Sequence, residues 1–395
     1  MNGPRPRIGV VLTGGGARAA YQVGVLRAIA DLIPKDVGNP FPIICGTSAG
    51  AINAVAVAAD AVNYRRAVRR LHAVWRDFRA EQVYRTDLPG VLRNSMKWMA
   101  AAVSAGLSHQ IVSLLDNSPL RELLARRLDF TAVQRAIDAG HLYALAVTCS
   151  GYTSGHSVCF FQAPPGAQPW RRARRIGVPA SIALDHLMAS SALPFIFPAV
   201  RINREYFGDG SMRQIAPVSP VLHLGAERVL VVAVGGQMQG HALPREPEST
   251  AVYPTLAQIA GHAMNSIFLD AMEADLERLQ RINRTLSLIP QEALQGSRTG
   301  LRHIDSMVVS PSEALEHIAM RHIHELPRTI RALFRSVGAT QRGGSTLLSY
   351  LLFGPGFCRE LMALGYKDAM AKRDNLSGFL GFHGEWYCEL RNTRA

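Results

Sequence analysis

Two short apolar segments near the start of the chain each end in a glycine-rich turn that leads directly into a helical pattern. The first covers residues 7–13, and apolar residues then recur at helical spacing over 17–33. The second, at 41–45, enters the turn 46–50 and then the alanine-rich stretch 51–59. Apolar strands that alternate with helices are typical of a parallel sheet covered on both faces. The pattern therefore predicts an α/β fold.

Later parts of the chain extend this pattern and then change it. Further strands are expected at residues 142–149, 158–162, 201–207, 228–234 and 285–289. After about residue 290 the pattern becomes helical. With 395 residues, the chain is long enough for one large domain and an appended segment. We expect an α/β domain over 1–290, with its motif-bearing core at about 7–235, and a mostly helical C-terminal extension over 291–395.

The chain carries a net charge of +13, which favours nucleic acid, anionic membrane or an acidic substrate as partner. No aromatic-interleaved basic motif and no zinc-ligand spacing supports nucleic acid, so we expect none to bind. Residues 64–79 combine six arginines with apolar residues at helical spacing. This helix either lies on anionic lipid or packs its apolar stripe on the core with a solvated arginine face; the second interpretation is slightly favoured.

The cysteines and the apolar runs indicate in which cellular compartment the protein is expected. Five cysteines is an odd number, and they are scattered without a CxxC pair, which argues against a disulfide framework and suits a reducing compartment. The first apolar run is too short for a signal peptide, and no run approaches the length of a membrane span. We therefore expect a cytoplasmic protein, with peripheral contact at the inner membrane surface as a further expectation.

Gly46-Thr47-Ser48-Ala49-Gly50 fits the pattern GxSxG between an apolar strand and a helix. Such a sharp turn lifts the serine oxygen out of the sheet, and its strained backbone requires small neighbours such as Gly46 and Gly50. The motif predicts a nucleophilic serine at Ser48. An ordinary glycine-rich turn between strand and helix is the alternative that this pentapeptide leaves open.

Gly14, Gly15 and Gly16 precede Ala17 and Arg18 between the first strand and its helix. Consecutive glycines there expose backbone N–H groups beside the positive end of a helix, where a phosphate or an oxyanion can bind. A dinucleotide-binding turn is the rival, with Asp36 as the ribose partner. It is disfavoured because Ala19 replaces the third glycine of that fingerprint.

The third element is Phe207-Gly208-Asp209-Gly210-Ser211, an acidic residue between two glycines after a short predicted strand. Flanking glycines allow a tight turn and the close approach of another backbone. A plain Asp-Gly turn is the alternative.

Together these elements resemble the patatin-like phospholipase family, and they occur in that family's order. A fourth segment, Ala189-Ser190-Ser191-Ala192-Leu193-Pro194, is similar to one that the family carries ahead of the aspartate. The resemblance implies a three-layer α/β/α sandwich with a mainly parallel central sheet. It also implies a serine acyl hydrolase that cleaves ester bonds of phospholipids or related lipids through an acyl-enzyme.

The resemblance assigns roles to individual residues. Ser48 is expected to be the nucleophile and Asp209 the proton acceptor of a Ser-Asp dyad. The oxyanion-hole N–H groups are expected from Gly14, Gly15, Gly16 and Ala49. Supporting positions are Arg18, Gly46, Gly50 and Gly210. No metal or cofactor is expected. Arg18 is expected to orient the glycine loop or to meet lipid phosphate, with a surface arginine as the alternative.

Two departures and two alternatives accompany this assignment. Ser211 stands where the family usually has Gly or Ala, and Ala19 ends the first loop. One alternative is a Ser-His-Asp esterase, with His223, His241 or His262 as the base. A carboxylate base is expected to remain active at mildly acidic pH, where an imidazole would be protonated. The other alternative is a catalytically silent, basic lipid-binding protein. An acyl pocket is expected within residues 83–128 and 188–197.

Overall fold

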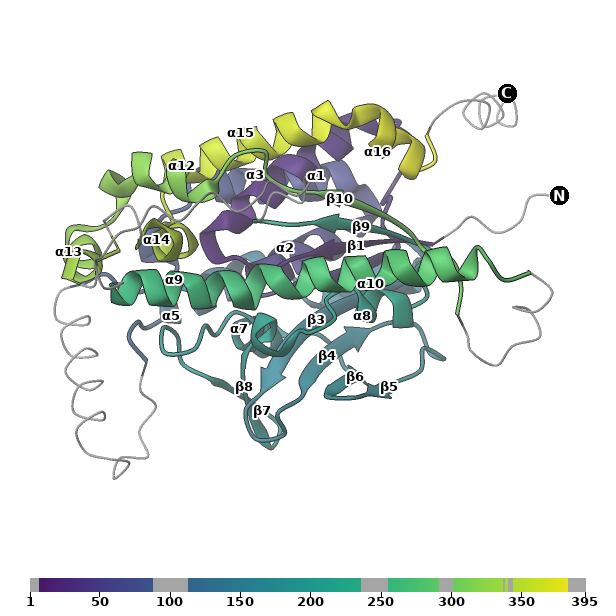
Figure 1. Cartoon of the computed structure of the whole chain (residues 1–395), viewed down its shortest axis with the longest axis horizontal. Helices are drawn as coiled ribbons and strands as arrows, with labels where there is room; N and C mark the ends of the chain where they lie inside the picture. Colours follow the sequence, from purple (N-terminus) through teal and green to yellow (C-terminus); the bar gives the residue numbers. More distant parts are fainter. Residues whose placement is uncertain are drawn as a thin grey trace.

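The computed structural model describes residues 7–87, 113–235, 255–290, 301–336, 338–339 and 344–382. In these residues one ten-stranded sheet runs in the order β10-β9-β1-β2-β3-β4-β6-β5, and the β7–β8 hairpin joins β3 (Figure 1). The strands are β1 (Ile8–Leu12), β2 (Ile43–Thr47), β3 (Ala144–Gly151), β4 (Ser157–Gln162), β5 (Trp170–Arg172), β6 (Arg175–Pro179), β7 (Val200–Ile202), β8 (Glu205–Asp209), β9 (Arg228–Val232) and β10 (Asp305–Val309).

The five strands from β10 to β3 are all parallel, and they form one half of the strand order, starting from the β10 edge. Their residues alternate between two apolar layers. Val10 and Leu12 pack into one hydrophobic cluster, whereas the intervening Val11 packs into the other. Because both faces are buried, β1 and β2 consist of buried residues throughout, as expected for parallel strands.

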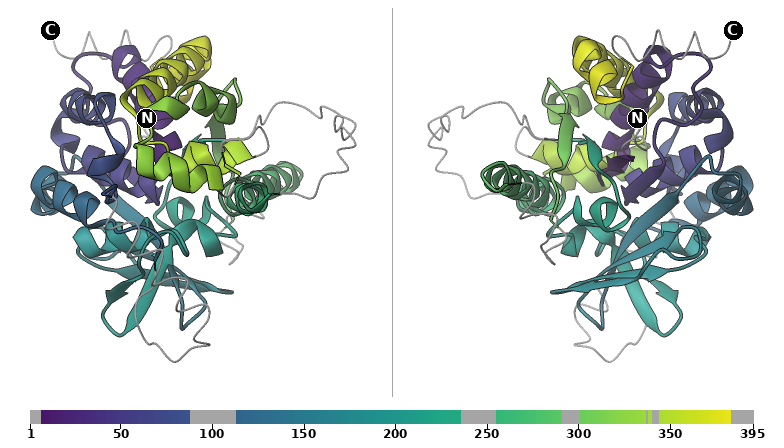
Figure 2. Two further views of the ribbon diagram at one scale, coloured as in Figure 1. Left: turned by 90° about the vertical axis from the view of Figure 1, so that its left-hand side faces the viewer. Right: turned by 90° about the vertical axis from the view of Figure 1, so that its right-hand side faces the viewer.

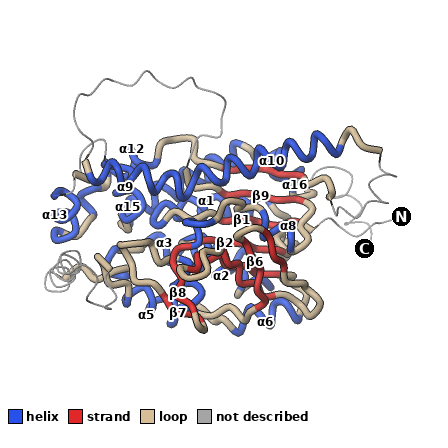
Figure 3. Tube along the Cα trace, turned by 60° about the horizontal axis from the view of Figure 1, so that its bottom comes forward, coloured by secondary structure: helices blue, strands red, loops and turns tan. Residues whose placement is uncertain are grey.

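Helices cover both faces of the sheet, as the end views and the tube drawing show (Figures 2 and 3). The larger cluster includes residues of α1 (Ala20–Leu32), α2 (Ala49–Ala58), α3 (Tyr64–Arg76), α5 (Ser118–Arg127), α6 (Thr131–Asp138) and α7 (Leu184–Ser190). The smaller cluster includes residues of α8 (Ser219–His223) and α10 (Ala271–Leu286). The predicted three-layer α/β/α architecture with a mainly parallel central sheet is confirmed.

The described residues after 300 are mostly helical, and they also complete the sheet. Their helices are α12 (Leu315–Arg321), α13 (Arg328–Ser336), α14 (Ser345–Leu351), α15 (Pro355–Ala371) and α16 (Arg373–Phe379). Strand β10 lies among them in sequence and pairs with β9 in parallel at the sheet edge. The expected extension is therefore joined to the sheet itself. A domain boundary at residue 290 stays a prediction.

The strand expected at residues 285–289 is wrong, because α10 continues to Leu286 and turns follow. The Leu-Ser-Leu alternation there imitates a strand in isolation. In the longer context Leu276, Leu279 and Leu286 are buried residues of a sixteen-residue helix. The length of the preceding helix explains why residues 285 and 286 are helical, since a helix that is already formed extends at little cost.

Helices α1 and α15, more than 300 residues apart in sequence, pack closely against each other (Figure 1). A Cβ atom on Gly24 would collide with the carbonyl oxygen of Met362, and one on Gly365 would collide with that of Tyr21. Only glycine allows the two backbones to approach this closely. Tyr21 also donates a hydrogen bond to Asp368 over 3.0 Å.

The arginine-rich helix α3 buries its apolar stripe in the core. Tyr64, Val68, Leu71 and Trp75 are all buried. Of the two interpretations of this helix, packing on the core with an outward arginine face is the one observed. No single helix in the described ranges is both long and apolar enough to cross a membrane; α14 and α15 reach that length only together, across a 95° bend.

Candidate active site

Ser48 lies at the turn between β2 and α2, with φ 54° and ψ −130°. A non-glycine residue with positive φ is strained, and such strain costs on the order of 1–3 kcal/mol. The neighbouring glycines permit it. A Cβ on Gly46 would strike the backbone of Gly50, and one on Gly50 would strike the carbonyl of Leu12. The turn has the conformation expected of a GxSxG elbow.

Ser190 holds this turn from the neighbouring helix α7. The Ser48 N–H donates to Oγ of Ser190 over 2.9 Å, and that hydroxyl donates to the Thr148 carbonyl over 2.6 Å. Ser190 is fully buried. Sequence reasoning assigned no role to Ser190, although it lies in the Ala189–Pro194 segment. A polar residue within such an apolar segment was the available signal.

The sheet topology brings Asp209 beside Ser48. Thr47, the residue before the serine, pairs with Thr148 of β3. The next residue of β3, Cys149, pairs with Asp209 at the end of β8. Gly210 is required at this point, because a Cβ there would collide with the Thr148 carbonyl. Two residues 161 positions apart in the chain thus end adjacent strand segments at one edge of the sheet.

Asp209 is fully buried, and burial raises the pKa of its carboxyl to about 6. The Ser48 hydroxyl and the N–H and hydroxyl of Ser211 lower that pKa, but by less. Oδ1 accepts the Ser211 N–H over 2.9 Å, whereas Oδ2 has no hydrogen-bond partner among the described residues. The Ser48 hydroxyl is thus close enough to lower the pKa of Asp209, but it does not form a well-aligned hydrogen bond with Oδ2. Catalytic hydrogen bonds are often long or poorly aligned in substrate-free sites.

This raised pKa corrects one expectation from the sequence. A carboxylate with an ordinary pKa would remain charged at mildly acidic pH, where an imidazole is protonated. With a pKa of about 6, Asp209 titrates close to the usual range of histidine. The acid limb of a pH profile therefore does not separate a dyad from a triad in this protein.

The glycine loop lies between the Asp209 turn and the C-terminal helices. A Cβ on Gly14 would collide with Oγ of Ser211, and one on Gly15 with the side chain of Val234. Gly16 has φ +54°, and a Cβ there would strike the carbonyl of Tyr350. The loop thus has no room for side chains on any of its three glycines.

Arg18 is buried, with 1% of its surface exposed, and it binds the C-terminal helices. Its Nε donates to Oγ of Ser349 over 2.8 Å, and its guanidinium lies 4.0 Å from the ring centre of Tyr350. Nη2 is 3.8 Å from a carboxylate oxygen of Glu316. A surface arginine and a lipid-phosphate contact are both wrong, because this guanidinium is enclosed by protein. It is placed to hold the glycine loop.

A cavity of about 810 Å³ opens from Ser48. As expected, part of its wall comes from residues 83–128 and 188–197, through Val83, three leucines of α5, Leu193 and Phe197. Further lining residues come from α2, α3, the start of α6 and the segment Tyr350–Phe353. Those walls were not predicted, because they depend on contacts between distant segments.

Of the candidate bases of the histidine alternative, the two that lie in the described residues are not joined to this site. His223 stacks on Trp170 at 4.9 Å between ring centres, and its Nδ1 contacts the Ser219 carbonyl over 2.8 Å. His262 is exposed on α9 (Leu256–Asn265), and His241 lies outside the described residues. Asp36, the ribose partner of the dinucleotide alternative, is exposed in the turn after α1.

Within the described ranges, His322, His324 and Glu325 could share a metal ion. His322 is already held between two carboxylates, 2.9 Å from Glu325 and 2.6 Å from Glu360. Glu325 also accepts the Gly356 N–H over 2.9 Å at the start of α15. The cluster thus joins α12 to α15 and contributes no side chain to the Ser48 cavity.

Comparisons with known proteins agree with this architecture. A family model described as "Patatin-like phospholipase" matches residues 10–222. A "cGAMP-activated phospholipase" from Pseudomonas aeruginosa (strain BWHPSA011 / Pa011) is 27% identical over 210 residues, 53% of this chain and 53% of that protein. "Lysophospholipase nte1" from Aspergillus terreus (strain NIH 2624 / FGSC A1156) is 43% identical over 75 residues, 18% of this chain and 5% of that protein.

The match thus spans about half the length of the first of these curated relatives and a small part of the second. Among solved structures, the crystal structure of VipD from Legionella pneumophila is 14% identical, with a TM-score of 0.34. That similarity covers 94% of this chain and 67% of the other.

Proposed function

The chain belongs to the patatin-like phospholipase family, and from that premise we propose that it hydrolyses acyl ester bonds of lipids through Ser48 and Asp209. The proposal rests on how a serine, a carboxylate and a cavity are arranged. A strained serine at a strand-to-helix turn adjoins a buried carboxylate and opens into a large, mostly apolar cavity. Cavities of this size are typical of small-molecule sites.

In the acylation step, Oγ of Ser48 attacks the ester carbonyl carbon while Asp209 accepts the hydroxyl proton. The tetrahedral intermediate then collapses, and the bond to the leaving alcohol breaks. Asp209 returns the proton to that alcohol. The acyl group remains on Ser48 as an ester. A water molecule repeats the same sequence, Asp209 again accepting the proton, and releases the fatty acid.

The negative charge on the carbonyl oxygen requires hydrogen-bond donors at fixed positions. Ala49 is the first residue of α2, so its N–H has no partner within the helix. The N–H groups of the Gly14–Gly16 loop supply the remaining donors in this proposal. Arg18 and Tyr350 hold that loop in place. Losing one such donor typically lowers turnover on the order of 10²–10³-fold.

The proposal includes the setting of the reaction. Four cysteines in the described ranges are buried free thiols, which supports a reducing, cytoplasmic compartment. The outward arginines of α3 support contact with an anionic lipid surface, from which the substrate is taken.

Ser48→Ala and Asp209→Asn should each abolish hydrolysis of a short-chain ester, because the first removes the nucleophile and the second removes the only base of the dyad. Labelling by a lipid-like fluorophosphonate should be lost in Ser48→Ala, and peptide mapping should place the label of the parent protein on Ser48. His223→Ala is the matched control. It should retain activity, since its ring binds Trp170 and Ser219 instead of the serine.

Two results would count against this proposal. An inactive but folded His223→Ala, beside a partly active Asp209→Asn, would favour the histidine triad. A parent protein that is neither labelled nor active on any ester would favour the silent lipid-binding alternative. Circular dichroism of each variant verifies that it is folded.

A further inference from the structure

The cavity at Ser48 follows one face of helix α2. Ile52 and Ala56 are the only residues of α2 that are not fully buried, and both line the cavity. Ala59, which ends the helix, lines it as well. At 1.5 Å per residue, the helix carries this wall about 15 Å from Ala49 to Ala59. The cavity is therefore elongated, with Ser48 at one end.

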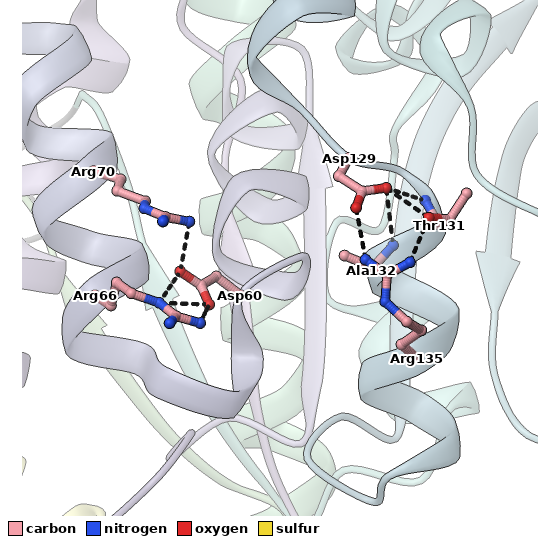
Figure 4. A network of polar contacts seen from close by, with 7 residues as sticks. All are labelled: Asp60, Arg66, Arg70, Asp129, Thr131, Ala132 and Arg135. Carbon is pink, nitrogen blue, oxygen red and sulfur yellow. Dashed lines mark hydrogen bonds and ion pairs between the residues drawn. The ribbon is translucent and has the colours of Figure 1, made fainter.

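Charged side chains mark the other end. Asp60 follows α2 and binds Arg66, whose Nε lies 2.9 Å from Oδ2, and Arg70, at 3.3 Å. At the start of α6, Asp129 binds Arg135 over 2.6 Å, as Figure 4 shows. All five residues line the cavity. Hydrocarbon that reaches this point meets ion pairs and solvent, so the apolar part of the cavity ends here.

Between the two ends, apolar side chains form the cavity walls, and a hydrogen bond fixes one of them in place. Leu71 and Trp75 of α3 and two leucines of α5, Leu120 and Leu124, line this part of the cavity. The Trp75 Nε1–H donates to Asn53 over 2.9 Å, which fixes the indole against α2. An apolar wall that runs from a nucleophile to a charged end fits an extended hydrocarbon chain.

We propose that this cavity is an acyl-chain ruler. The ester carbonyl lies at Ser48, the chain runs along α2, and positions 52, 56 and 59 set the longest chain that is accepted. The proposal rests on the proposed function, because it needs the ester at Ser48. The reverse orientation, with the lipid headgroup at the charged end, would leave the scissile ester remote from the serine oxygen.

The ruler makes a graded prediction. For the parent protein, kcat/KM should rise with chain length by up to about fourfold per methylene and stop rising when the chain reaches the charged end. Ile52→Phe, Ala56→Phe and Ala59→Phe should each block the cavity at a different depth. The chain length at which activity falls should increase in the order 52, 56, 59.

The experiment compares butanoyl, octanoyl, dodecanoyl and hexadecanoyl esters of one chromogenic alcohol. Chains longer than the block should lose about tenfold or more, since forcing atoms into filled space costs as much as overpacking a core. The matched control is Val62→Phe, which adds the same ring at a residue that is 53% exposed and does not line the cavity. Its chain-length profile should equal that of the parent.

Butanoyl turnover and fluorophosphonate labelling separate the two proposals. If the parent lacks both, the proposed function fails. If both are present but the three variants lose activity at the same chain length, or at none, the ruler is overturned. A loss in Arg70→Gln that appears with phospholipid but not with a neutral ester of equal chain length would overturn the orientation. Graded loss in the stated order supports the ruler, because a general folding defect would not depend on chain length.

Discussion

At the scale of single residues, Asp209 shows a conflict between chemistry and stability. A buried carboxylate with one oxygen lacking a hydrogen-bond partner among the described residues is costly to ionise. The proposed reaction nevertheless needs the ionised form. Deprotonation through a pKa of about 6 should therefore raise activity while it lowers the free energy of unfolding.

The sign of the stability effect follows from the two pKa values. Asp209 titrates at about 6 in the folded protein and near 3.8 when unfolded, so the folded state holds its proton more tightly. Stability from this group is present below the unfolded pKa and is lost as pH rises through 6. Since each tenfold difference in proton affinity is worth about 1.4 kcal/mol, the total loss of stability is about 3 kcal/mol.

Asp209→Asn removes this loss and should stabilise the folded protein at neutral pH. Its advantage over the parent in urea unfolding should be about 2 kcal/mol larger at about pH 7.5 than at about pH 4, because the parent is largely protonated at the lower pH. Ser48→Ala, which keeps the carboxylate, serves as the control. If Asp209→Asn is stabilised equally at both pH values, ionisation of Asp209 is not the source of the effect.

At the scale of elements, the contact between α1 and α15 tolerates little change. Gly24→Ala places a methyl group against the carbonyl of Met362, which is backbone and cannot move aside by a rotamer change. We expect a loss of about 1–3 kcal/mol or more, as for other overpacked positions. Thermal unfolding of the purified variant measures it.

Gly38→Ala is the control for this effect. Its Cβ would meet only one atom, the Val62 carbonyl oxygen at 4.0 Å, and its φ lies outside the left-handed region. The change should alter the free energy of unfolding by no more than about 0.5 kcal/mol. Equal losses in the two variants would mean that the close helix contact is not the cause.

The elements that sequence reasoning found are those whose signals are local. Apolar runs and glycine turns predicted β1, β2 and the elbow at Ser48, because a strained turn requires small residues in the adjacent sequence. Strand β10 was missed, since five residues between helical segments have no clear period. The partners of Arg18 were missed for another reason: Ser349 and Tyr350 lie more than 300 residues away. Motif spacing carries no information about such contacts.

At the scale of the whole molecule, the net charge of +13 should decide where the protein binds. Because α3 buries its apolar stripe, the proposed attraction of this helix to lipid is expected to come from its arginines. Sedimentation with anionic vesicles should therefore fall as salt rises, since the Debye length shrinks to about 3 Å at 1 M.

Ser48→Ala is the form to use in this measurement, because it leaves the vesicles uncleaved. Neutral vesicles provide the comparison at each salt concentration. Equal sedimentation with anionic and neutral vesicles, or binding that salt does not weaken, would contradict an electrostatic origin.

The anchoring of Arg18 and Gly16 by residues near 350 also has a consequence for biosynthesis. During synthesis Ser48 leaves the ribosome before Asp209, and Ser349 and Tyr350, which support the glycine loop, leave it after both. A nascent chain that stops before α14 thus carries both reactive groups and lacks the contacts that hold the loop. The proposed ester hydrolysis should therefore require synthesis to continue at least through α14.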